Sequence, residues 1–261
     1  MDLIGKGVRL IMKSRFGVRL MHKVFRSINA PQLKNLFIDH YKFNFFSDGM
    51  ATIHNFNFAY DERFLEAYER SGARDIEEDE LGLGFRLYNY CYAAAQASFL
   101  EGDYVECGVH KGMCSKAITH YIGFEKLNKK LYLLDTFEGL IENQLKDGEL
   151  FWQYPDTYSE VKEAFKQYSN VELVKGIIPD TLPLVKADKI CYLALDLNCA
   201  YPEIKALEYF WDKIVSGGII ILDDYAYRGF EAQMKAIDEF AKNRNVKVLN
   251  LNCGQGLIIK P

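Results

Sequence analysis

The chain of 261 residues is long enough for one large α/β domain, or for a core domain with a smaller cap. Its composition, 49% apolar and 26% charged, is typical of a soluble globular protein, and a net charge of −4 gives no general attraction to nucleic acid. No apolar run reaches the roughly 20 residues that a membrane-spanning helix needs. The six cysteines are scattered without a C-x-x-C pair, which favours a reduced, cytoplasmic protein without structural zinc.

The first 30 residues combine positive charge with apolar residues at roughly helical intervals. Their basic side chains interrupt every apolar stretch, so no signal peptide is expected. The pattern predicts a basic amphipathic helix. Such a helix can dock on its own protein or on a second subunit of a homo-oligomer, which we favour, or it can contact an anionic membrane surface peripherally.

Residues 31–80 contain many aromatic side chains, broken up by Asn, Asp and Gly. This pattern favours short helices and loops over strands, with one helix at 60–71. The pattern changes from Leu83 onward. We therefore divide the chain into a helical N-terminal cap or arm, residues 1–80, and a second domain, residues 81–261.

Strand-like apolar segments alternate with helical stretches in the second domain, which is typical of a parallel sheet. The expected strands lie at 103–107, 131–135, 171–174, 190–195 and 218–222, and Ser216-Gly217-Gly218 is expected to form the tight turn that leads into the last of them. The expected helices lie at 85–100, 112–124, 158–168, 202–214 and 229–243. Two further strands, 247–251 and 257–260, flank Asn-Cys-Gly-Gln-Gly as an antiparallel hairpin. The predicted fold is an α/β, Rossmann-like sheet of seven strands.

The most informative motif is Glu106-x-Gly108-x-x-x-Gly112, where the first strand breaks into a glycine turn. Glycine lets this turn approach a ligand because no Cβ stands in the way. The next strand ends on Asp135, which would lie beside the same crevice and can accept hydrogen bonds from ribose hydroxyls. Dinucleotide folds instead use G-x-G-x-x-G for a pyrophosphate. The spacing therefore favours S-adenosylmethionine over NAD, with an ordinary turn as the alternative.

Carboxylates also follow two later strands, Asp196 after 190–195 and Asp223 with Asp224 after 218–222. Ligands of open α/β sheets bind beyond the carboxyl ends of the strands, so these three side chains are expected to converge on the cofactor crevice. Mg²⁺ would offset their repulsion and lower the pKa of a substrate hydroxyl. A carboxylate at the edge of this site could act as general base. The alternative is a helix N-cap or a solvated turn.

Five segments in the same order resemble the macrocin O-methyltransferase family, class I enzymes that methylate sugar hydroxyls in antibiotic biosynthesis. They run through most of residues 84–261: Gly102-Asp-Tyr-Val-Glu-Cys-Gly-Val-His-Lys-Gly, Asp135-Thr-Phe-Glu-Gly-Leu, Lys175-Gly176 with Asp180-Thr-Leu-Pro, Leu195-Asp196, and Gly217-Gly-Ile-Ile-Ile-Leu-Asp-Asp-Tyr. The resemblance implies a methyltransferase sheet with an N-terminal region that covers the active site and contributes to oligomer contacts.

The resemblance also implies roles for the cofactor residues. Glu106 and Gly108 would line the S-adenosylmethionine pocket, and Asp135 would hold the ribose. Three further residues of the matching segments complete the expected cofactor pocket: Gly112, Thr136 and Gly176.

In the acidic segments, the resemblance implies Mg²⁺ binding by Asp196, Asp223 and Asp224, with Asp196 also the catalytic base. The chain departs from the family pattern after the first of these residues. The family usually has Asp-Gly-Asp followed by an aromatic residue and Glu, where this chain has Asp196-Leu-Asn198-Cys-Ala-Tyr201-Pro-Glu203.

Together, these patterns predict an S-adenosylmethionine- and Mg²⁺-dependent O-methyltransferase. The expected acceptor is a hydroxyl of a sugar, nucleotide sugar, glycoconjugate or other natural product, and no nucleic-acid partner is expected. A methyltransferase for a different small-molecule acceptor is the first alternative. An NAD-type oxidoreductase is disfavoured by the missing G-x-G-x-x-G motif, and a non-catalytic interaction protein by the retained carboxylates.

Overall fold

The computed structural model describes residues 42–75, 81–145, 149, 151 and 153–261. The predicted basic helix within residues 1–30 lies outside these described residues. The described part falls into two units, residues 42–46 with 51–55, and residues 47–50 with 56–261. The larger unit contains the sheet and every candidate site residue.

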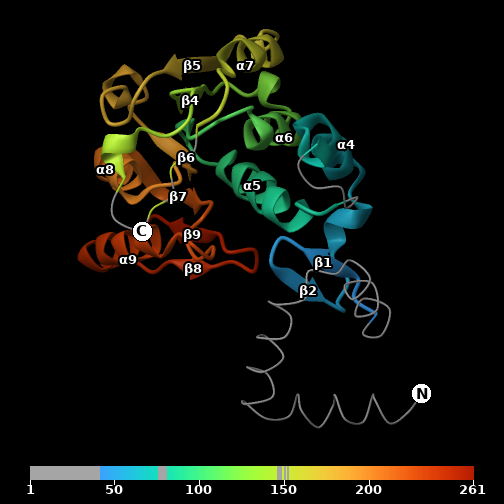
Figure 1. Ribbon diagram of the computed structural model, residues 1–261. Coiled ribbons are helices and arrows are strands. Elements are labelled where there is room, and N and C mark those ends of the chain that lie inside the picture. Colours follow the sequence, from blue (N-terminus) through green and yellow to red (C-terminus); the bar gives the residue numbers. More distant parts are fainter. Residues whose placement is uncertain (1–41, 76–80, 146–148, 150, 152) are drawn as a thin grey trace, which may run out of the picture. The chain divides into compact units, whose positions relative to one another are not determined.

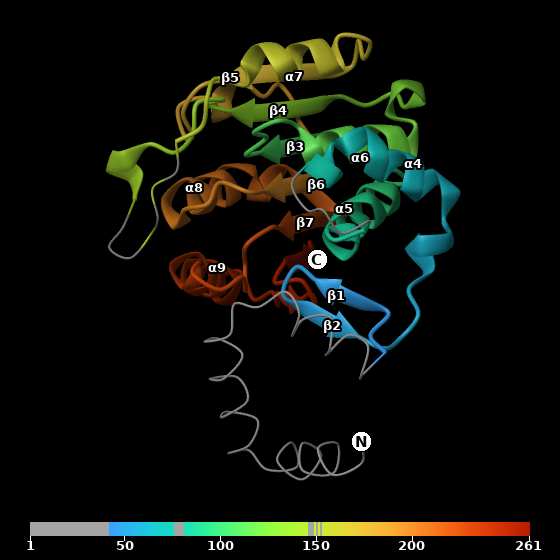
Figure 2. The ribbon, with the colours of Figure 1, turned by 45° about the vertical axis from the view of Figure 1, so that its right-hand side comes forward.

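Seven strands of the larger unit form one sheet in the order β5-β4-β3-β6-β7-β9-β8 (Figure 1, Figure 2). The strands are β3 Asp103–Cys107, β4 Leu131–Asp135, β5 Val171–Lys175, β6 Ile190–Leu195, β7 Ile214–Leu222, β8 Leu249–Asn250 and β9 Gly256–Ile259. Strands β3 to β7 pair in parallel, whereas β9 pairs antiparallel with both β7 and β8. The predicted seven-stranded α/β sheet and its antiparallel hairpin are confirmed.

Helices cover both faces of this sheet. They are α4 Glu62–Ser71, α5 Gly84–Ala97, α6 Met113–Ile122, α7 Tyr158–Phe165, α8 Ala200–Phe210 and α9 Glu231–Asn243. Helix α6 packs against α4 and α5, and α8 packs against α9 (Figure 1). No helix in the described part of the chain has the length and apolar character needed to cross a membrane.

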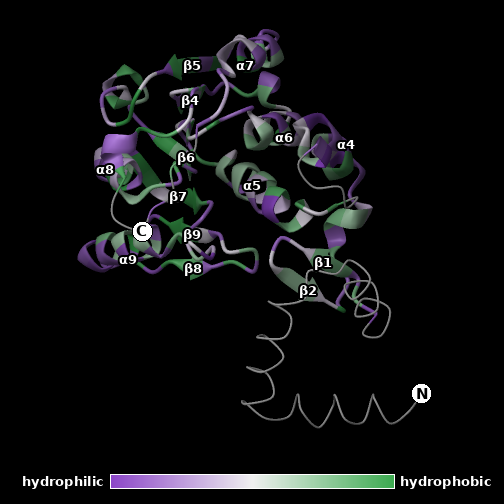
Figure 3. Ribbon diagram, in the orientation of Figure 1, coloured by the Kyte–Doolittle hydropathy of each residue, from purple (hydrophilic) through white to green (hydrophobic). Residues whose placement is uncertain are grey.

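Strand side chains alternate between two hydrophobic cores because successive residues point to opposite faces. Tyr104 and Tyr192 belong to the core shared with α5 and α6, whereas Val105 and Leu193 belong to the core shared with α8 and α9. Strand β6 is buried along its whole length, as expected for a parallel strand covered on both faces, and Figure 3 shows its hydrophobic character. Polar chemistry is therefore concentrated at the strand ends.

The expectation of helices and loops alone was wrong within residues 45–52, where two short strands form a separate two-stranded sheet. These strands are β1 Phe45–Ser47 and β2 Met50–Thr52. Asp48 and Gly49 connect them with φ angles of 47° and 73°. A two-residue turn with positive φ at both positions matches the twist of a hairpin, and Asp-Gly is a strong signal for it.

The predicted start of β7 at residue 218 was also wrong, because the strand begins at Ile214. Gly217 has a φ of 81°, and the pairing register between β6 and β7 shifts in this part of the strands. Gly217 N–H nevertheless donates to Lys260 O at 2.8 Å, and Lys260 N–H donates to Gly218 O at 2.8 Å. The glycine pair is therefore an irregularity inside the strand, as is typical of a bulge, and not the turn before it.

The core of β6 should tolerate truncation poorly. Leu193 is fully buried, so Leu193→Ala is expected to lower the free energy of unfolding by about 2–5 kcal/mol, measured by urea denaturation. Leu184→Ala is the matched control because that side chain is 50% exposed. An equal loss in the two variants would contradict the assignment of the core.

Candidate active site

The turn between β3 and α6, residues 108–112, is held in shape by Asp135 at the end of β4. Backbone N–H groups of Val109 and His110 donate to Asp135 Oδ2 at 2.6 and 2.8 Å. Phe137 N–H donates to Asp135 Oδ1 at 2.6 Å. The carboxylate lies beside the glycine turn, as expected, and it also fixes the conformation of that turn, which the sequence did not reveal.

Gly108 makes the closest approach between this turn and the first acidic loop. Its φ is 89°, and a Cβ placed there would lie 1.8 Å from the carbonyl oxygen of Asp196. Asp196 N–H donates to Cys107 O at 2.9 Å, which extends the pairing of β3 with β6. Only glycine permits this contact, so Gly108 sets the spacing between the glycine turn and the first acidic loop.

Glu106 is a buried acid on β3, only 3% exposed. Burial raises its pKa to about 8, while a 2.5 Å hydrogen bond donated by the Ser115 hydroxyl to Glu106 Oε2 acts in the opposite direction. The carboxyl group is therefore mostly neutral at pH 7. A bound cation beside it would favour the ionised form.

Two cavities flank the glycine turn. The first has a volume of about 140 Å³, and its lining includes Asp135, Thr136, Gly176, Ile177 and Ile178. The second has a volume of about 210 Å³, and its lining includes Glu106, Lys111 and Lys116. Gly108 and Asp196 line both cavities. An elongated ligand that passes the turn would therefore contact nearly all of the predicted cofactor residues.

Gly112 is the predicted cofactor residue that is not among the lining residues of these two cavities. It precedes the first turn of α6 with a φ of 75°, and a Cβ there would lie 3.1 Å from the ring of Phe165. The structure thus places Gly112 at a helix start that packs against α7.

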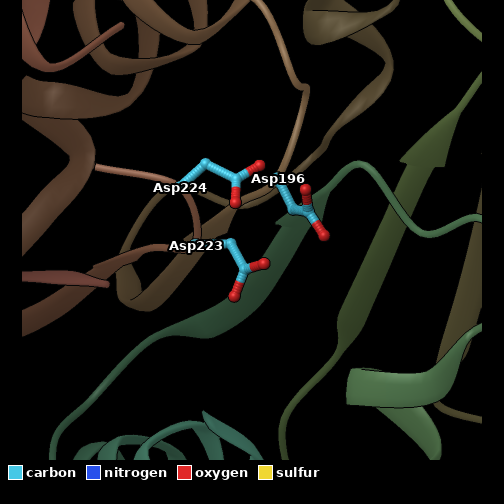
Figure 4. A group of neighbouring side chains, drawn as sticks. All are labelled: Asp196, Asp223 and Asp224. Atoms are coloured by element: carbon cyan, nitrogen blue, oxygen red, sulfur yellow. The ribbon is translucent and has the colours of Figure 1, made fainter. Parts of the chain in front are cut away.

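The three acidic side chains predicted to converge lie together in the structure. One carboxylate oxygen from each of Asp196, Asp223 and Asp224 lies within 4.8 Å of the others (Figure 4). They meet because β6 and β7 are parallel neighbours. Burial, followed by the charge of Asp223, raises the pKa of Asp196 well above its usual range and that of Asp224 to about 7. A cation would relieve this repulsion.

Arg86, in the first turn of α5, is a buried cation of the site that sequence reasoning missed. Arg86 Nη1 donates to Asp223 Oδ2 at 2.5 Å and lies 3.9 Å from Asp224 Oδ1. Arg86 Nε and Nη2 donate to the two carboxylate oxygens of Asp48 at 2.9 and 3.2 Å. The sequence did contain one signal for this role, a single Arg in a helix otherwise rich in Ala and Tyr. Because a buried Arg needs a partner, such a residue indicates a paired acid nearby.

The loop after Asp196 is held by residues of the segment that departs from the family pattern. Asn198 has a φ of 55°, and its Nδ2 donates to Asp196 Oδ1 at 2.9 Å. Glu203 Oε1 accepts hydrogen bonds from Leu197 N–H at 3.2 Å and from Gln233 Nε2 at 2.8 Å. Burial raises the pKa of Glu203 to about 8. These contacts fix the backbone at Leu197 and the side chain of Asp196.

Comparison with solved structures identifies the class of fold. The O-methyltransferase NovP matches with a TM-score of 0.59 at 20% identity, covering 69% of this chain and 81% of that one. The calicheamicin methyltransferase CalS11 matches with a TM-score of 0.57 at 16% identity, covering 79% of this chain and 94% of that one. The sheet is therefore the Rossmann-like sheet of these methyltransferases.

Comparison of sequences identifies the family. The profile of the macrocin-O-methyltransferase family (TylF) matches residues 84–251, more than half of the chain. The chain belongs to this family, as the resemblance in sequence implied. A Streptomyces olivaceus relative, 8-demethyl-8-(2,3-dimethoxy-alpha-L-rhamnosyl)-tetracenomycin-C 4'-O-methyltransferase, is 26% identical over 153 residues. The matched region spans 52% of this chain and 58% of that relative.

The close approach at Gly108 predicts a large effect of one added methyl group. Gly108→Ala should lower the free energy of unfolding by more than the roughly 1–3 kcal/mol that a strained backbone angle alone costs, because the Cβ would overlap Asp196 O. Gly229→Ala is the control, since Gly229 also has a positive φ, 102°, but a Cβ there meets no atom within 4 Å. Equal losses in chemical denaturation would argue against the close approach.

Proposed function

We propose that the protein is an S-adenosylmethionine-dependent O-methyltransferase that acts on a hydroxyl of a sugar or glycoconjugate. The proposal rests on the two cavities that meet at Gly108 and Asp196 beside three clustered carboxylates, in a chain of the macrocin-O-methyltransferase family. Residues 81–261 would form the cofactor-binding domain, and residues 1–80 the cap. Homo-oligomer formation and a membrane contact through residues 1–30 stay predictions.

The first cavity offers partners for an adenosine group. Thr136 Oγ1 lies 3.3 Å from Asp135 Oδ1, but its only proton is used in a 2.7 Å hydrogen bond to Gly139 O. Phe137 N–H occupies one lone pair of Asp135 Oδ1, so the other lone pair remains for a ribose hydroxyl. Ile177 and Ile178 supply apolar lining for an adenine ring.

The second cavity offers charges that suit the amino-acid end of the cofactor. Glu106 can face an ammonium group, and Lys111 and Lys116 can face a carboxylate. Since both cavities share Gly108 and Asp196, the reactive methyl group, which S-adenosylmethionine supplies as a sulfonium electrophile, would lie near these two residues.

The acidic cluster fits a divalent cation through the chemistry of its donors. Carboxylate oxygens are the ligands that Mg²⁺ prefers. Arg86 cannot neutralise all three acids, because its charge is also paired with Asp48. Mg²⁺ bound by Asp196, Asp223 and Asp224 would lower the pKa of an acceptor hydroxyl. We assign Asp196 as the general base. Asn198 Nδ2 donates to Asp196 Oδ1, which leaves Oδ2 to accept the proton of the acceptor hydroxyl.

The acceptor class is supported by the names of a sequence relative and of a structural neighbour. The Streptomyces olivaceus enzyme is named for O-methylation of a rhamnosyl-tetracenomycin, and CalS11 is described as a TDP-rhamnose 3'-O-methyltransferase. We therefore propose a sugar hydroxyl, carried on a nucleotide or on a natural product. A different small-molecule acceptor is the second candidate, because the loop after Asp196 departs from the family pattern.

Cofactor binding should depend on pH through Glu106. Its pKa is about 8, so at lower pH a proton must leave before the carboxylate can face an ammonium group. The association constant of S-adenosylhomocysteine is expected to rise from about pH 6 to about pH 8 and then level off. Glu106→Gln should weaken binding and flatten this rise. Isothermal titration calorimetry in this range provides the measurement.

Glu172→Gln is the matched control, because Glu172 lies on β5 with an exposed side chain. It should keep the wild-type affinity and the wild-type dependence on pH. An affinity that does not change with pH in the wild-type protein, or a rise that persists in Glu106→Gln, would contradict the role of Glu106.

The cation should serve the acceptor, with the three carboxylates acting as a unit. EDTA is expected to abolish methyl transfer from labelled S-adenosylmethionine to a panel of nucleotide sugars and glycosides, while S-adenosylhomocysteine still binds. Asp196→Asn and Asp223→Asn should each remove most of the rate, and the double variant little more, because groups that act together are non-additive.

Asp238→Asn is the control for this series, since Asp238 lies on α9, outside the cluster, and accepts a 2.6 Å hydrogen bond from the Tyr225 hydroxyl. Melting temperatures of all variants would be measured alongside the rates. Full transfer in EDTA would exclude the cation and leave Asp196 as a simple general base. Additive stability losses with normal turnover would mean that these residues are ordinary strand ends.

A further inference from the structure

Asp223 differs from the other two acids of the cluster because buried side chains bond both of its oxygens. Arg86 Nη1 donates to Oδ2 at 2.5 Å, and Gln255 Nε2 donates to Oδ1 at 2.8 Å. Both donors are buried, with exposures of 7% for Arg86 and 0% for Gln255. Asp224 has a longer contact, 3.9 Å to Arg86 Nη1. The orientation of Asp223 is thus fixed from two sides.

Gln255 is itself oriented by a second amide. Asn89 Nδ2 donates to Gln255 Oε1 at 2.9 Å, which directs the Gln255 NH₂ group toward Asp223. Asn89 lies one turn after Arg86 on α5, so both residues belong to the same face of this helix. Helix α5 therefore acts on Asp223 directly through Arg86 and indirectly through Asn89 and Gln255.

The turn between β8 and β9 places Gln255 at this position. Gly254 has a φ of 87°, and its carbonyl oxygen accepts a 2.6 Å hydrogen bond from Ala226 N–H. A Cβ on Gly256 would lie 2.8 Å from the Tyr225 ring. The Gly-Gln-Gly sequence thus packs against the backbone that follows Asp224, and the two glycines permit that approach. This explains the glycines of the predicted hairpin beyond their role in turning the chain.

The Arg86 guanidinium is held equally firmly. Its fork contacts both oxygens of Asp48, and Nη2 also donates to Cys253 O at 3.2 Å. Lysine could not reproduce this arrangement, because an ammonium group has no planar fork. The contacts to Asp48 and to Asp223 therefore depend on arginine and not on positive charge alone.

We propose that Gln255 and Arg86 are positioning residues that orient Asp223 for a divalent cation, with Asn89 orienting Gln255 in turn. This inference rests on the proposed function, because it assumes that the acidic cluster binds a cation. It adds a support that links α5 and the β8–β9 turn to the cation site. Partners of this kind orient the ligating side chain, and their loss typically weakens metal binding by about 10–100-fold.

Charge-conserving substitutions separate orientation from electrostatics. Gln255→Leu removes the amide without changing the charge of the site, and Arg86→Lys keeps the charge but loses the fork. Asn89→Ala removes only the residue that orients Gln255. The control is Asn170→Ala. Asn170 lies just before β5, at the opposite end of the strands from the cluster, and its Nδ2 donates to three backbone carbonyl oxygens.

The test is calorimetric titration of the full-length protein with Mn²⁺ in the absence of cofactor, with melting temperatures measured for each variant. We expect Mn²⁺ binding to weaken by about tenfold or more in Gln255→Leu and Arg86→Lys. Asn89→Ala should weaken it less, and Asn170→Ala should bind as the wild type does even where its melting temperature falls. Gln255→Leu decides the question if Arg86→Lys does not fold.

Wild-type Mn²⁺ affinity in folded Gln255→Leu would overturn the inference and leave the proposed function intact. An equal loss of affinity in Asn170→Ala would also overturn it, because the effect would then follow general stability. Failure of the wild-type protein to bind Mn²⁺ would overturn both the inference and the cation of the proposed function. In that case S-adenosylhomocysteine binding would still test the cofactor proposal separately.

Discussion

Four neighbouring parallel strands, β4, β3, β6 and β7, each carry a carboxylate at or near their carboxyl ends, and the rest of the site depends on how these acids are accommodated. Strands in a sheet lie about 4.8 Å apart, so acids at these ends repel one another. Glu106 is accommodated by retaining its proton, Asp135 by accepting backbone N–H groups, and Asp223 by pairing with Arg86. Asp196 shares its surroundings with Asp223 and has a raised pKa. Three of the four acids are thus accommodated in three different ways, whereas the charge of Asp196 stays uncompensated by a cation in direct contact among the described residues.

The arrangement of the sheet and the meeting of the acids could be predicted, because both follow from local patterns. An apolar segment that ends on Asp marks the carboxyl end of a strand, and parallel neighbours bring such ends together. The same reasoning failed for the Asp48-Gly49 hairpin, where aromatic residues obscured a turn signal, and for Gly217-Gly218, where two glycines suggested a turn but form a bulge. Periodicity reveals regular elements more readily than local irregularities.

The partners of the acids could not be predicted, because they come from distant parts of the chain. Arg86 and Asp223 are 137 positions apart, and Gln255 reaches Asp223 from a turn near the other end of the sequence. Nothing local indicates that Asp135 binds backbone N–H groups of two separate segments in addition to its proposed ribose contact. Such roles depend on the tertiary approach of segments and not on residue type.

The pairing of Arg86 with Asp48 explains how a buried arginine could coexist with the proposed cation site. An isolated guanidinium beside three carboxylates would compete with a metal ion for the same charge. Asp48 accepts two of the hydrogen bonds of Arg86 and balances much of its positive charge. In a buried pair with good geometry, the attraction between the two charges offsets the cost of removing them from water. Arg86 then contributes a directional hydrogen bond to Asp223 while the cluster as a whole stays acidic. Orientation and net charge are thereby set by different side chains, which would let the cluster remain ordered and still attract the proposed divalent cation.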